Sequence, residues 1–306
     1  MMHQKNISIP SIETKNLHYR FSSGQVAVDQ IALSVPEGSI YGFLGPNGAG
    51  KTTTLRLLLG LLRKQQGEIR FFGTSFHDHR LAVLSRVGTM IETPSVYGHL
   101  SARNNLRIWA KIQGSTEGRI NEVLELVGLM NSGKKKADAF SLGMKQRLGI
   151  AVALLHQPRI LILDEPTNGL DPKGIIEIRD LLKRLNQEHR ITILISSHIL
   201  AEVEKLVTHI GVINHGKLLF QGTLAELVSK QSSGVLLETD QNEAAMSILK
   251  KQGIICDSQK AFLLLPSLKK EEIAALISLL THAGISIYRV EPIDKNLESI
   301  FMDLIK

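Results

Sequence analysis

Apolar residues along the chain fall into two kinds of segment, and their alternation predicts an α/β fold. Short continuous apolar runs at Ile40–Leu44, Arg159–Leu163 and Ile191–Ser196 have the length of buried strands. Segments with helical spacing of apolar residues, Thr52–Leu62 and Gly174–Glu188, lie between these runs. Buried strands that alternate with helices are typical of a mostly parallel sheet covered by helices on both faces.

Other segments add to this core. Residues 11–35 contain short alternating stretches and turns, which predict strands, and residues 95–155 are mostly helical with polar faces. We therefore expect a helical subdomain over about residues 95–155. The pair His209–Asn214 and Lys217–Gln221 predicts two closing strands.

The chain is expected to divide near residue 232, where the polar stretch SKQSSG has the composition of a linker. This gives a first domain over residues 1–231 and an accessory α+β module over residues 232–306. The pattern beyond the linker predicts the order β-α-β-β-α-β of a ferredoxin-like module, followed by a terminal helix. The expected elements are strands at Val235–Glu238, Ile254–Ile255, Ala261–Leu265 and Ser286–Val290, and helices at Glu243–Gln252 and Lys270–His282.

Composition adds little to this prediction. Hydrophobic residues make up 43% of the 306 residues and charged residues 21%, as in ordinary globular proteins. No window reaches the roughly 18 consecutive apolar residues of a membrane helix, so we expect a soluble chain that would need partner subunits to act across a membrane. The single cysteine, Cys256, excludes an intrachain disulfide. The net charge of +7 suits nucleotides, nucleic acids and anionic membranes equally.

A glycine-rich loop directly follows the apolar run Ile40–Leu44, and it matches the pattern G-x-x-x-x-G-K-[ST]. Glycines let consecutive backbone N–H groups curve around an anion, and the helix that follows adds its positive end. Lys51 is expected to contact the β- and γ-phosphates, and the Thr52 hydroxyl to bind Mg²⁺. The predicted nucleotide-binding residues of this loop are Gly45, Pro46, Asn47, Gly48, Ala49, Gly50, Lys51, Thr52 and Thr53.

Two carboxylates, Asp164 and Glu165, follow a second apolar run and complete this candidate site. Asp164 can hold the Mg²⁺ ion, and Glu165 can polarise the attacking water as a general base. These two motifs alone would fit many nucleotide hydrolases and kinases.

The segment from Phe140 to Arg147, FSLGMKQR, resembles the signature of ATP-binding cassette (ABC) ATPases, best known as L-S-G-G-Q. Ser141 and Gly143 match that signature, whereas Phe140, Leu142 and Met144 depart from it. By itself Ser141 would be an ordinary helix N-cap. The resemblance implies that Ser141 and Gly143 bring a second helix N-terminus to the γ-phosphate.

Further residues resemble this family in the expected order. Asn168–Asp171 is similar to its D-loop, His198 to its switch histidine, and Tyr19 to the aromatic residue that stacks on adenine. The resemblance implies a P-loop fold that binds ATP and Mg²⁺ and acts as a head-to-tail dimer. In that dimer each ATP lies between one chain's phosphate loop and the signature of a second ATPase chain, expected here to be an identical copy. The catalytic residues would be Glu165 and His198.

Glu92 occupies a position where most family members have a glutamine that contacts Mg²⁺ and the membrane partner. The substitution could be neutral, because both side chains offer an oxygen to a cation. Glutamate here, with Pro94 and Tyr97 after it, also resembles the ATPases of bacterial exporters that protect against bacitracin and lantibiotics. The C-terminal segment Glu298–Phe301 is similar to tails in that group. Glu92 is thus a predicted nucleotide-binding residue and a possible Mg²⁺ ligand.

The resemblance implies a peripheral ATPase on the cytoplasmic face of the membrane, bound to multi-span permease subunits, with no nucleic acid expected. One alternative is the ATPase of another drug or ion efflux system. A soluble cassette ATPase acting on DNA or ribosomes fits less well, because the segment between Lys51 and Ser141 contains no coiled-coil heptads and the chain has one cassette. An ordinary kinase or GTPase would leave the signature and His198 unexplained.

Overall fold

The computed structural model describes residues 9–92, 94–230, 234–259, 262–266, 268–293 and 297–305. The chain divides into two compact units, one of residues 1–224 together with 304–306, and the other of residues 225–303. The linker expected near residue 232 lies outside the described residues, and the division between the units falls earlier, at the start of helix α8 (Leu224–Lys230).

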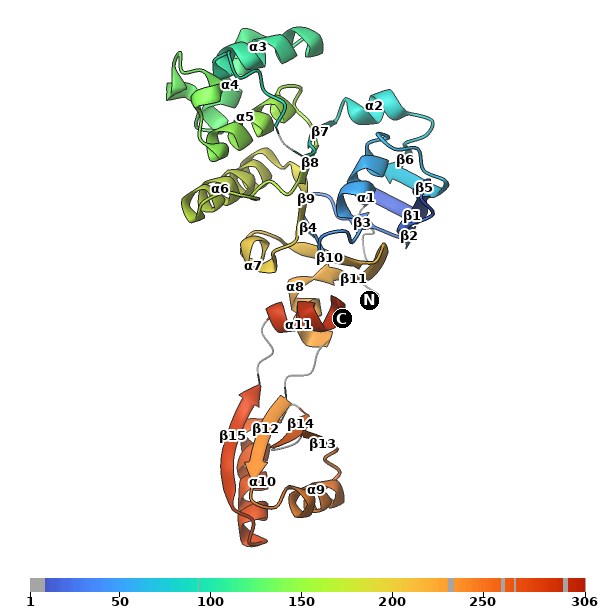
Figure 1. The fold of residues 1–306 in the computed structure, drawn as a ribbon, viewed down its shortest axis with the longest axis vertical. Helices are drawn as coiled ribbons and strands as arrows, with labels where there is room; N and C mark the ends of the chain where they lie inside the picture. The colour runs from blue at the N-terminus through green and yellow to red at the C-terminus, as the bar shows by residue number, and fades with distance from the viewer. Residues whose placement is uncertain are drawn as a thin grey trace, which may run out of the picture. The chain divides into compact units, whose positions relative to one another are not determined.

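The first unit is built on a sheet in the order β11-β10-β4-β9-β8-β7 (Figure 1). Its strands from β10 to β7 are parallel, and β11 pairs antiparallel with β10. Every residue of β4 and β8 is buried, which explains their continuous apolar runs. The strands are β4 (Ile40–Leu44), β7 (Val87–Met90), β8 (Ile160–Asp164), β9 (Thr192–Ser197), β10 (His209–Asn214) and β11 (Lys217–Thr223). The predicted parallel α/β core is confirmed.

A second, antiparallel sheet in the order β2-β1-β5-β6, with β3 paired to β1, lies in the same unit. One hydrophobic core joins residues of both sheets and of helix α1 (Lys51–Leu58), among them Phe43 and Phe71. The strands are β1 (Ile12–Arg20), β2 (Val26–Ile31), β3 (Ser34–Val35), β5 (Gln66–Phe71) and β6 (Thr74–Ser75). Tyr19, near the end of β1, packs against this core.

Helices α3, α4 and α5 gather at one end of the first unit, in the range predicted to be helical (Figure 1). Side-chain caps set their starts: Ser101, Thr116 and Ser141 each accept a backbone N–H of the first turn. The helices of this unit are α2 (Arg80–Leu84), α3 (Ala102–Gln113), α4 (Glu117–Leu126), α5 (Leu142–Leu154), α6 (Pro172–His189) and α7 (Leu200–Val203), with short 3₁₀ turns at Met130–Ser132 and Ala137–Ala139. No helix in the described part of the chain combines the length and hydropathy that a membrane span requires.

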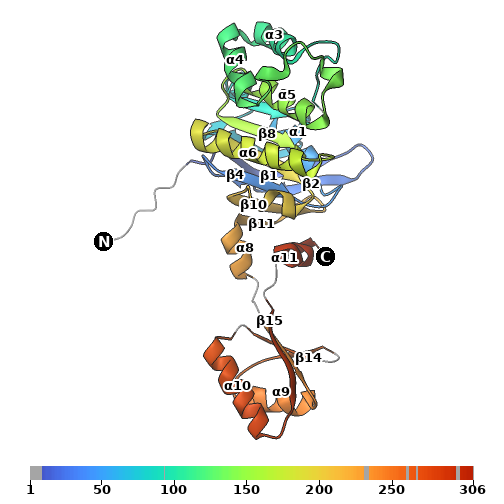
Figure 2. The same ribbon diagram turned by 90° about the vertical axis from the view of Figure 1, so that its left-hand side faces the viewer.

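The second unit has the β-α-β-β-α-β order of a ferredoxin-like module, with an antiparallel sheet in the order β13-β14-β12-β15 (Figure 1). Helices α9 and α10 of this unit lie beside the sheet (Figure 2). Leu249 of α9 and Leu280 of α10 share one core with Leu237 and Leu263 of the sheet. The elements are β12 (Gly234–Thr239), α9 (Asn242–Lys251), β13 (Asp257–Gln259), β14 (Phe262–Pro266), α10 (Lys270–His282) and β15 (Ile287–Ile293), followed by α11 (Leu297–Ile305).

The strand predicted at Ile254–Ile255 is wrong, because these residues directly follow the turn that ends α9. Gly253 has φ +76°, and the Ile254 N–H donates to the Leu249 carbonyl at 3.0 Å, a common way for a helix to terminate. Ile255 is 83% exposed. The strand begins two positions later in the chain, at Asp257.

Gly88 provides a test of how tightly β7 packs on α5. A Cβ added at Gly88 would lie 2.3 Å from the Ala153 carbonyl oxygen of α5, a backbone atom that cannot move without displacing the helix. We expect Gly88→Ala to destabilise the protein by about 1–3 kcal/mol and to lower Tm in thermal unfolding. The matched control is Gly118→Ala in α4, where the nearest atom is 3.7 Å away. It should leave Tm unchanged or raise it, and equal losses in both variants would contradict the packing argument.

Candidate active site

The carboxyl ends of three neighbouring strands carry the predicted site residues. Leu44, at the end of β4, lies opposite Ser197 of β9, and Asp164, at the end of β8, lies opposite Ser196. The loops that follow these strands therefore leave the sheet side by side. Ligands bind at this edge of parallel sheets, because the following helices begin there and present their N–H groups.

The phosphate loop joins β4 to α1 and needs glycine at two places. A Cβ at Gly45 would lie 2.2 Å from the Ile213 carbonyl oxygen, and one at Gly50, whose φ is +106°, would lie 2.3 Å from the Ala27 carbonyl oxygen. Lys51 is only 6% exposed, and its Nζ donates to the carbonyls of Gly45 at 2.7 Å and Pro46 at 3.2 Å. The ammonium group is therefore held over the loop, where an anion would need it.

Thr52 and Asp164 place two hard oxygen ligands together. The Thr52 hydroxyl donates to Asp164 Oδ2 at 2.7 Å, and Asp164 itself is buried. Mg²⁺ binds carboxylate and hydroxyl oxygens and keeps waters and phosphate oxygens as its other ligands. This donor set next to the phosphate loop fits the ion that the sequence predicts.

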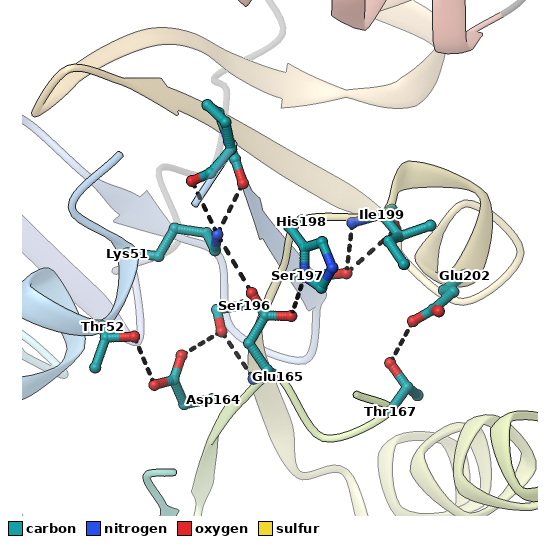
Figure 3. Close-up of polar contacts among 12 residues, drawn as sticks. Lys51, Thr52, Asp164, Glu165, Thr167, Ser196, Ser197, His198, Ile199 and Glu202 are labelled. Atoms are coloured by element: carbon teal, nitrogen blue, oxygen red, sulfur yellow. Dashed lines mark hydrogen bonds and ion pairs between the residues drawn. The ribbon is translucent and has the colours of Figure 1, made fainter. Parts of the chain in front are cut away.

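Glu165 lies between two hydrogen-bond donors (Figure 3). Its Oε1 is 3.3 Å from Lys51 Nζ, and its Oε2 is 2.7 Å from His198 Nδ1. The backbone of Glu165 has φ +47°, a left-handed conformation that few residues other than glycine and asparagine adopt. The turn after β8 thus aims the carboxylate at the lysine of the phosphate loop and at His198, which directly follows β9.

Several of the predicted residues line one cavity of about 400 Å³. Its walls are formed by Phe21, Gln25, Ala27, Asn47, Gly48, Gly50, Lys51, Thr52, Thr53, Glu165, Asn168 and His198. The sequence did not single out Phe21, Gln25 and Ala27. They reach the cavity because the turn after β1, closed by the Gly24 N–H to the Phe21 carbonyl at 2.9 Å, folds beside the phosphate loop.

Tyr19 is not among the residues that line this cavity. It is half-buried and packs against the core of the unit, and its ring meets the edge of the Phe21 ring at a centroid distance of 5.2 Å. Phe21 stands in the wall of the cavity instead. The alternation of strand β1 turns Tyr19 toward the core, whereas Phe21 follows the end of the strand and lies in the wall of the cavity. The adenine-stacking role of Tyr19 stays a prediction, and Phe21 is an aromatic side chain that this cavity offers for the same role.

Other predicted residues also do not line this cavity: Gly45, Pro46, Ala49 and Asp164, which lie next to residues that do, and Ser141, Gly143 and Glu92. Ser141 caps helix α5 and is exposed. An added Cβ on Gly143 would meet Leu170 of the D-loop segment at 3.8 Å. Glu92, whose side chain is 57% exposed, forms an ion pair with Arg56 of α1 and has φ +66°. Within one chain, Ser141, Gly143 and Glu92 therefore do not form part of the cavity wall.

A phosphate loop between a buried strand and a helix, facing two carboxylates on the same sheet, defines the class of P-loop nucleoside triphosphate hydrolases. The ABC transporter family model matches residues 28–168. The chain is 44% identical over 298 residues to the bacitracin transport ATP-binding protein BcrA of Bacillus licheniformis, covering 96% of this chain and 97% of that protein. It is 44% identical over 194 residues to the lantibiotic transport ATP-binding protein SrtF of Streptococcus pyogenes, covering 63% and 83%.

Solved structures agree with this relationship. The structure of cbiO1 of Clostridium perfringens, part of the ABC transporter complex cbiONQ, matches with a TM-score of 0.66 at 28% identity, covering 72% of this chain and 91% of that one. The dimeric ATP-binding cassette MJ0796, bound to ADP and Pi in a post-hydrolysis state, matches with a TM-score of 0.62 at 25% identity, covering 70% and 98%. The chain belongs to the ABC transporter family. It is an ATP-binding subunit that hydrolyses ATP.

Nucleotide binding tests whether Phe21, in place of Tyr19, is the aromatic residue that stacks on adenine. Stacking of a base on an aromatic ring contributes about 1–3 kcal/mol, so Phe21→Ala should raise the Kd for ATP roughly 5- to 150-fold. Tyr19→Phe keeps the ring that packs on the core and should bind ATP normally. A fluorescent ATP analogue titrated against both variants measures the difference. Unchanged affinity in Phe21→Ala would remove Phe21 from the adenine site.

Proposed function

We propose that this chain powers an exporter that protects the cell against a peptide antibiotic of the bacitracin or lantibiotic kind. It would act as a homodimer on the cytoplasmic face of the membrane, attached to multi-span permease subunits. The observation that carries this proposal is the similarity to the bacitracin transport protein over 97% of that protein's length, which extends through the second unit. A common cassette alone would not require similarity beyond the first unit.

The residues of the site suggest how ATP is cleaved. The phosphate loop and Lys51 would bind the phosphates, and Thr52 and Asp164 would hold Mg²⁺, which neutralises charge on the phosphate oxygens. Phosphate oxygens would compete with Glu165 for the Lys51 ammonium and for His198, since both groups now contact its carboxylate. The freed carboxylate can accept a proton from a water placed in line with the γ-phosphate.

A second chain would complete the site. Ser141 and Gly143 lie outside the cavity of their own chain, yet helix α5 presents a capped N-terminus with exposed residues. Such a helix end attracts an anion from another molecule. Head-to-tail pairing would bring the α5 N-terminus of one copy to the phosphate loop of the other. The dimeric MJ0796 cassette supports this arrangement.

Glu165→Gln separates binding from hydrolysis. The amide keeps the shape of the side chain but cannot accept the proton of the attacking water, so hydrolysis should fall roughly 100- to 10,000-fold. ATP binding should remain, and the variant should accumulate as an ATP-bound dimer in size-exclusion chromatography. A variant that stays monomeric at saturating ATP would contradict the shared site, and wild-type turnover would contradict the role of Glu165.

An apolar groove of about 640 Å³ gives the permease a place to dock. Its walls come from the segment after α1, from α2, from β7 and the segment after it, and from α3 and α5. They include Leu61, which is 61% exposed. His156 lies in this groove with Nε2 3.2 Å from the Val87 carbonyl oxygen, and burial lowers its pKa. We assign to this groove a short amphipathic helix from a cytoplasmic loop of the permease.

A permease helix bound in this groove would affect the ATP site by displacing α5. A Cβ on Gly149 of α5 would lie 2.6 Å from Met90 Sδ and 2.8 Å from Pro94 Cβ, so the segment on both sides of Glu92 packs directly on the helix. Met90, Pro94 and Gly149 also line the groove. A helix seated there would push on the element whose N-terminus carries the signature.

Glu92 should therefore affect coupling more than nucleotide binding. Its exposed ion pair with Arg56 is worth about 1 kcal/mol at most, so Glu92→Ala should change the Kd for ATP by less than about fivefold. The same variant should fail to protect cells that carry the complete transporter against the cognate peptide, measured as the inhibitory concentration. Glu92→Gln is the matched control for charge, because it keeps an oxygen at this position.

Full protection by Glu92→Ala would reduce Glu92 to a neutral substitution. Protection by Glu92→Gln alone would show that an oxygen suffices, and loss in both variants would show that the charge is needed. A transporter that protects against no bacitracin- or lantibiotic-type peptide would instead overturn the cargo assignment and leave the ATPase assignment intact.

A further inference from the structure

Ser196 is a buried hydroxyl at the centre of the candidate site. It is the penultimate residue of β9 and is 0% exposed, and the register of the sheet sets it opposite Asp164 of β8. The chain thus places a polar side chain in a fully buried strand pair, where an unpaired hydroxyl would cost free energy. Its partners explain what it does there.

The Ser196 hydroxyl makes two hydrogen bonds of opposite sense (Figure 3). Its Oγ donates to Asp164 Oδ1 at 2.5 Å, and it accepts the backbone N–H of Glu165 at 2.9 Å. A serine hydroxyl has one proton to donate and lone pairs to accept, so one side chain can serve both residues. Because Thr52 occupies Asp164 Oδ2 at 2.7 Å, the carboxylate of Asp164 is fixed at both oxygens.

The hydrogen bond from the Glu165 N–H to Ser196 Oγ holds the backbone of Glu165. This residue has φ +47°, a conformation that costs free energy for a residue with a Cβ and persists only where the surroundings hold it. The Ser196 hydroxyl receives the N–H of this turn. This turn sets the direction of the Glu165 side chain, whose Oε2 lies 2.7 Å from His198 Nδ1.

We propose that Ser196 is a positioning residue for ATP hydrolysis, which through one hydroxyl aligns the Mg²⁺-binding carboxylate and the general base. The inference rests on the roles proposed above for Asp164 and Glu165. Ser196 itself does not line the nucleotide cavity, so it acts on the reaction through these two neighbours. The sequence alone marks it only as one of two serines before His198.

Ser196→Ala removes both hydrogen bonds with little change in volume. Loss of a side chain that orients a metal ligand costs roughly 10- to 100-fold in activity, and we expect that fall in kcat with a KM for Mg²⁺-ATP that changes less than about threefold. Ser196→Thr keeps the hydroxyl and suits a strand, so it should restore most of kcat. Each purified full-length variant is measured against wild type.

A readout without nucleotide separates positioning from general damage. The amide of Glu165 loses its acceptor in Ser196→Ala, so its hydrogen exchange, followed by NMR in the nucleotide-free protein, should become roughly tenfold faster. The matched control is Thr192→Val at the other end of the same strand. Thr192 is 1% exposed, and its Oγ1 accepts the Gly38 N–H at 2.9 Å, far along β9 from the carboxylates.

Thr192→Val should lower Tm without changing kcat or the exchange of the Glu165 amide. Wild-type kcat in Ser196→Ala would overturn the inference, and so would equal losses of kcat in Ser196→Ala and Thr192→Val. Wild-type turnover in Glu165→Gln would overturn the underlying role of Glu165. If Ser196→Ala is fully active while Glu165→Gln is not, the proposed function stands and the role of Ser196 falls.

Discussion

The hydrogen-bonded register of the parallel strands β4, β9 and β8 is the constraint on which the site depends. It sets Leu44 beside Ser197 and Asp164 beside Ser196, so three loops from distant parts of the sequence leave one edge of the sheet together. A shift of one residue in any strand would turn its side chains to the opposite face. The Thr52–Asp164 and Glu165–His198 contacts would then be lost, since each joins loops that only this register brings together.

The polar side chains at this edge of the sheet hold one another in place through hydrogen bonds and ion pairs. Asp164 accepts from Thr52 and Ser196, and Glu165 contacts Lys51 and His198. Each carboxylate is therefore held by at least one residue of the phosphate loop, Thr52 for Asp164 and Lys51 for Glu165, and an anionic substrate would redistribute these contacts without any large movement of the sheet. Preorganised charges of this kind stabilise charge that develops in a transition state, because they need no reorganisation during the reaction.

Helix α5 joins the two surfaces proposed above to meet the second ATPase chain and the permease. Its N-terminus, capped by Ser141, carries the signature, and its Gly149 lies under the segment that contains Met90 and Pro94. Thirteen residues of helix span about 20 Å, and a helix transmits displacement along its length as a rigid element. The absence of a Cβ at Gly149 lets the two segments approach closely, so movement at the groove cannot be absorbed by a gap.

Local patterns in the sequence determined the strands, the phosphate loop and the order of the motifs. Each of these motifs is defined by residues that are adjacent in the sequence. This holds for the glycine loop, for the buried run that ends in two carboxylates, and for the histidine after the next buried run. These features were therefore readable from spacing, although the roles of the individual residues stay predictions.

Only the tertiary structure decided which side chains meet across the chain. It placed Phe21 in the cavity wall in preference to Tyr19, paired Glu92 with Arg56, and set Ser196 between Asp164 and Glu165. Each of these contacts depends on the direction in which a turn or strand end points, and that direction follows from packing and register between segments far apart in the sequence.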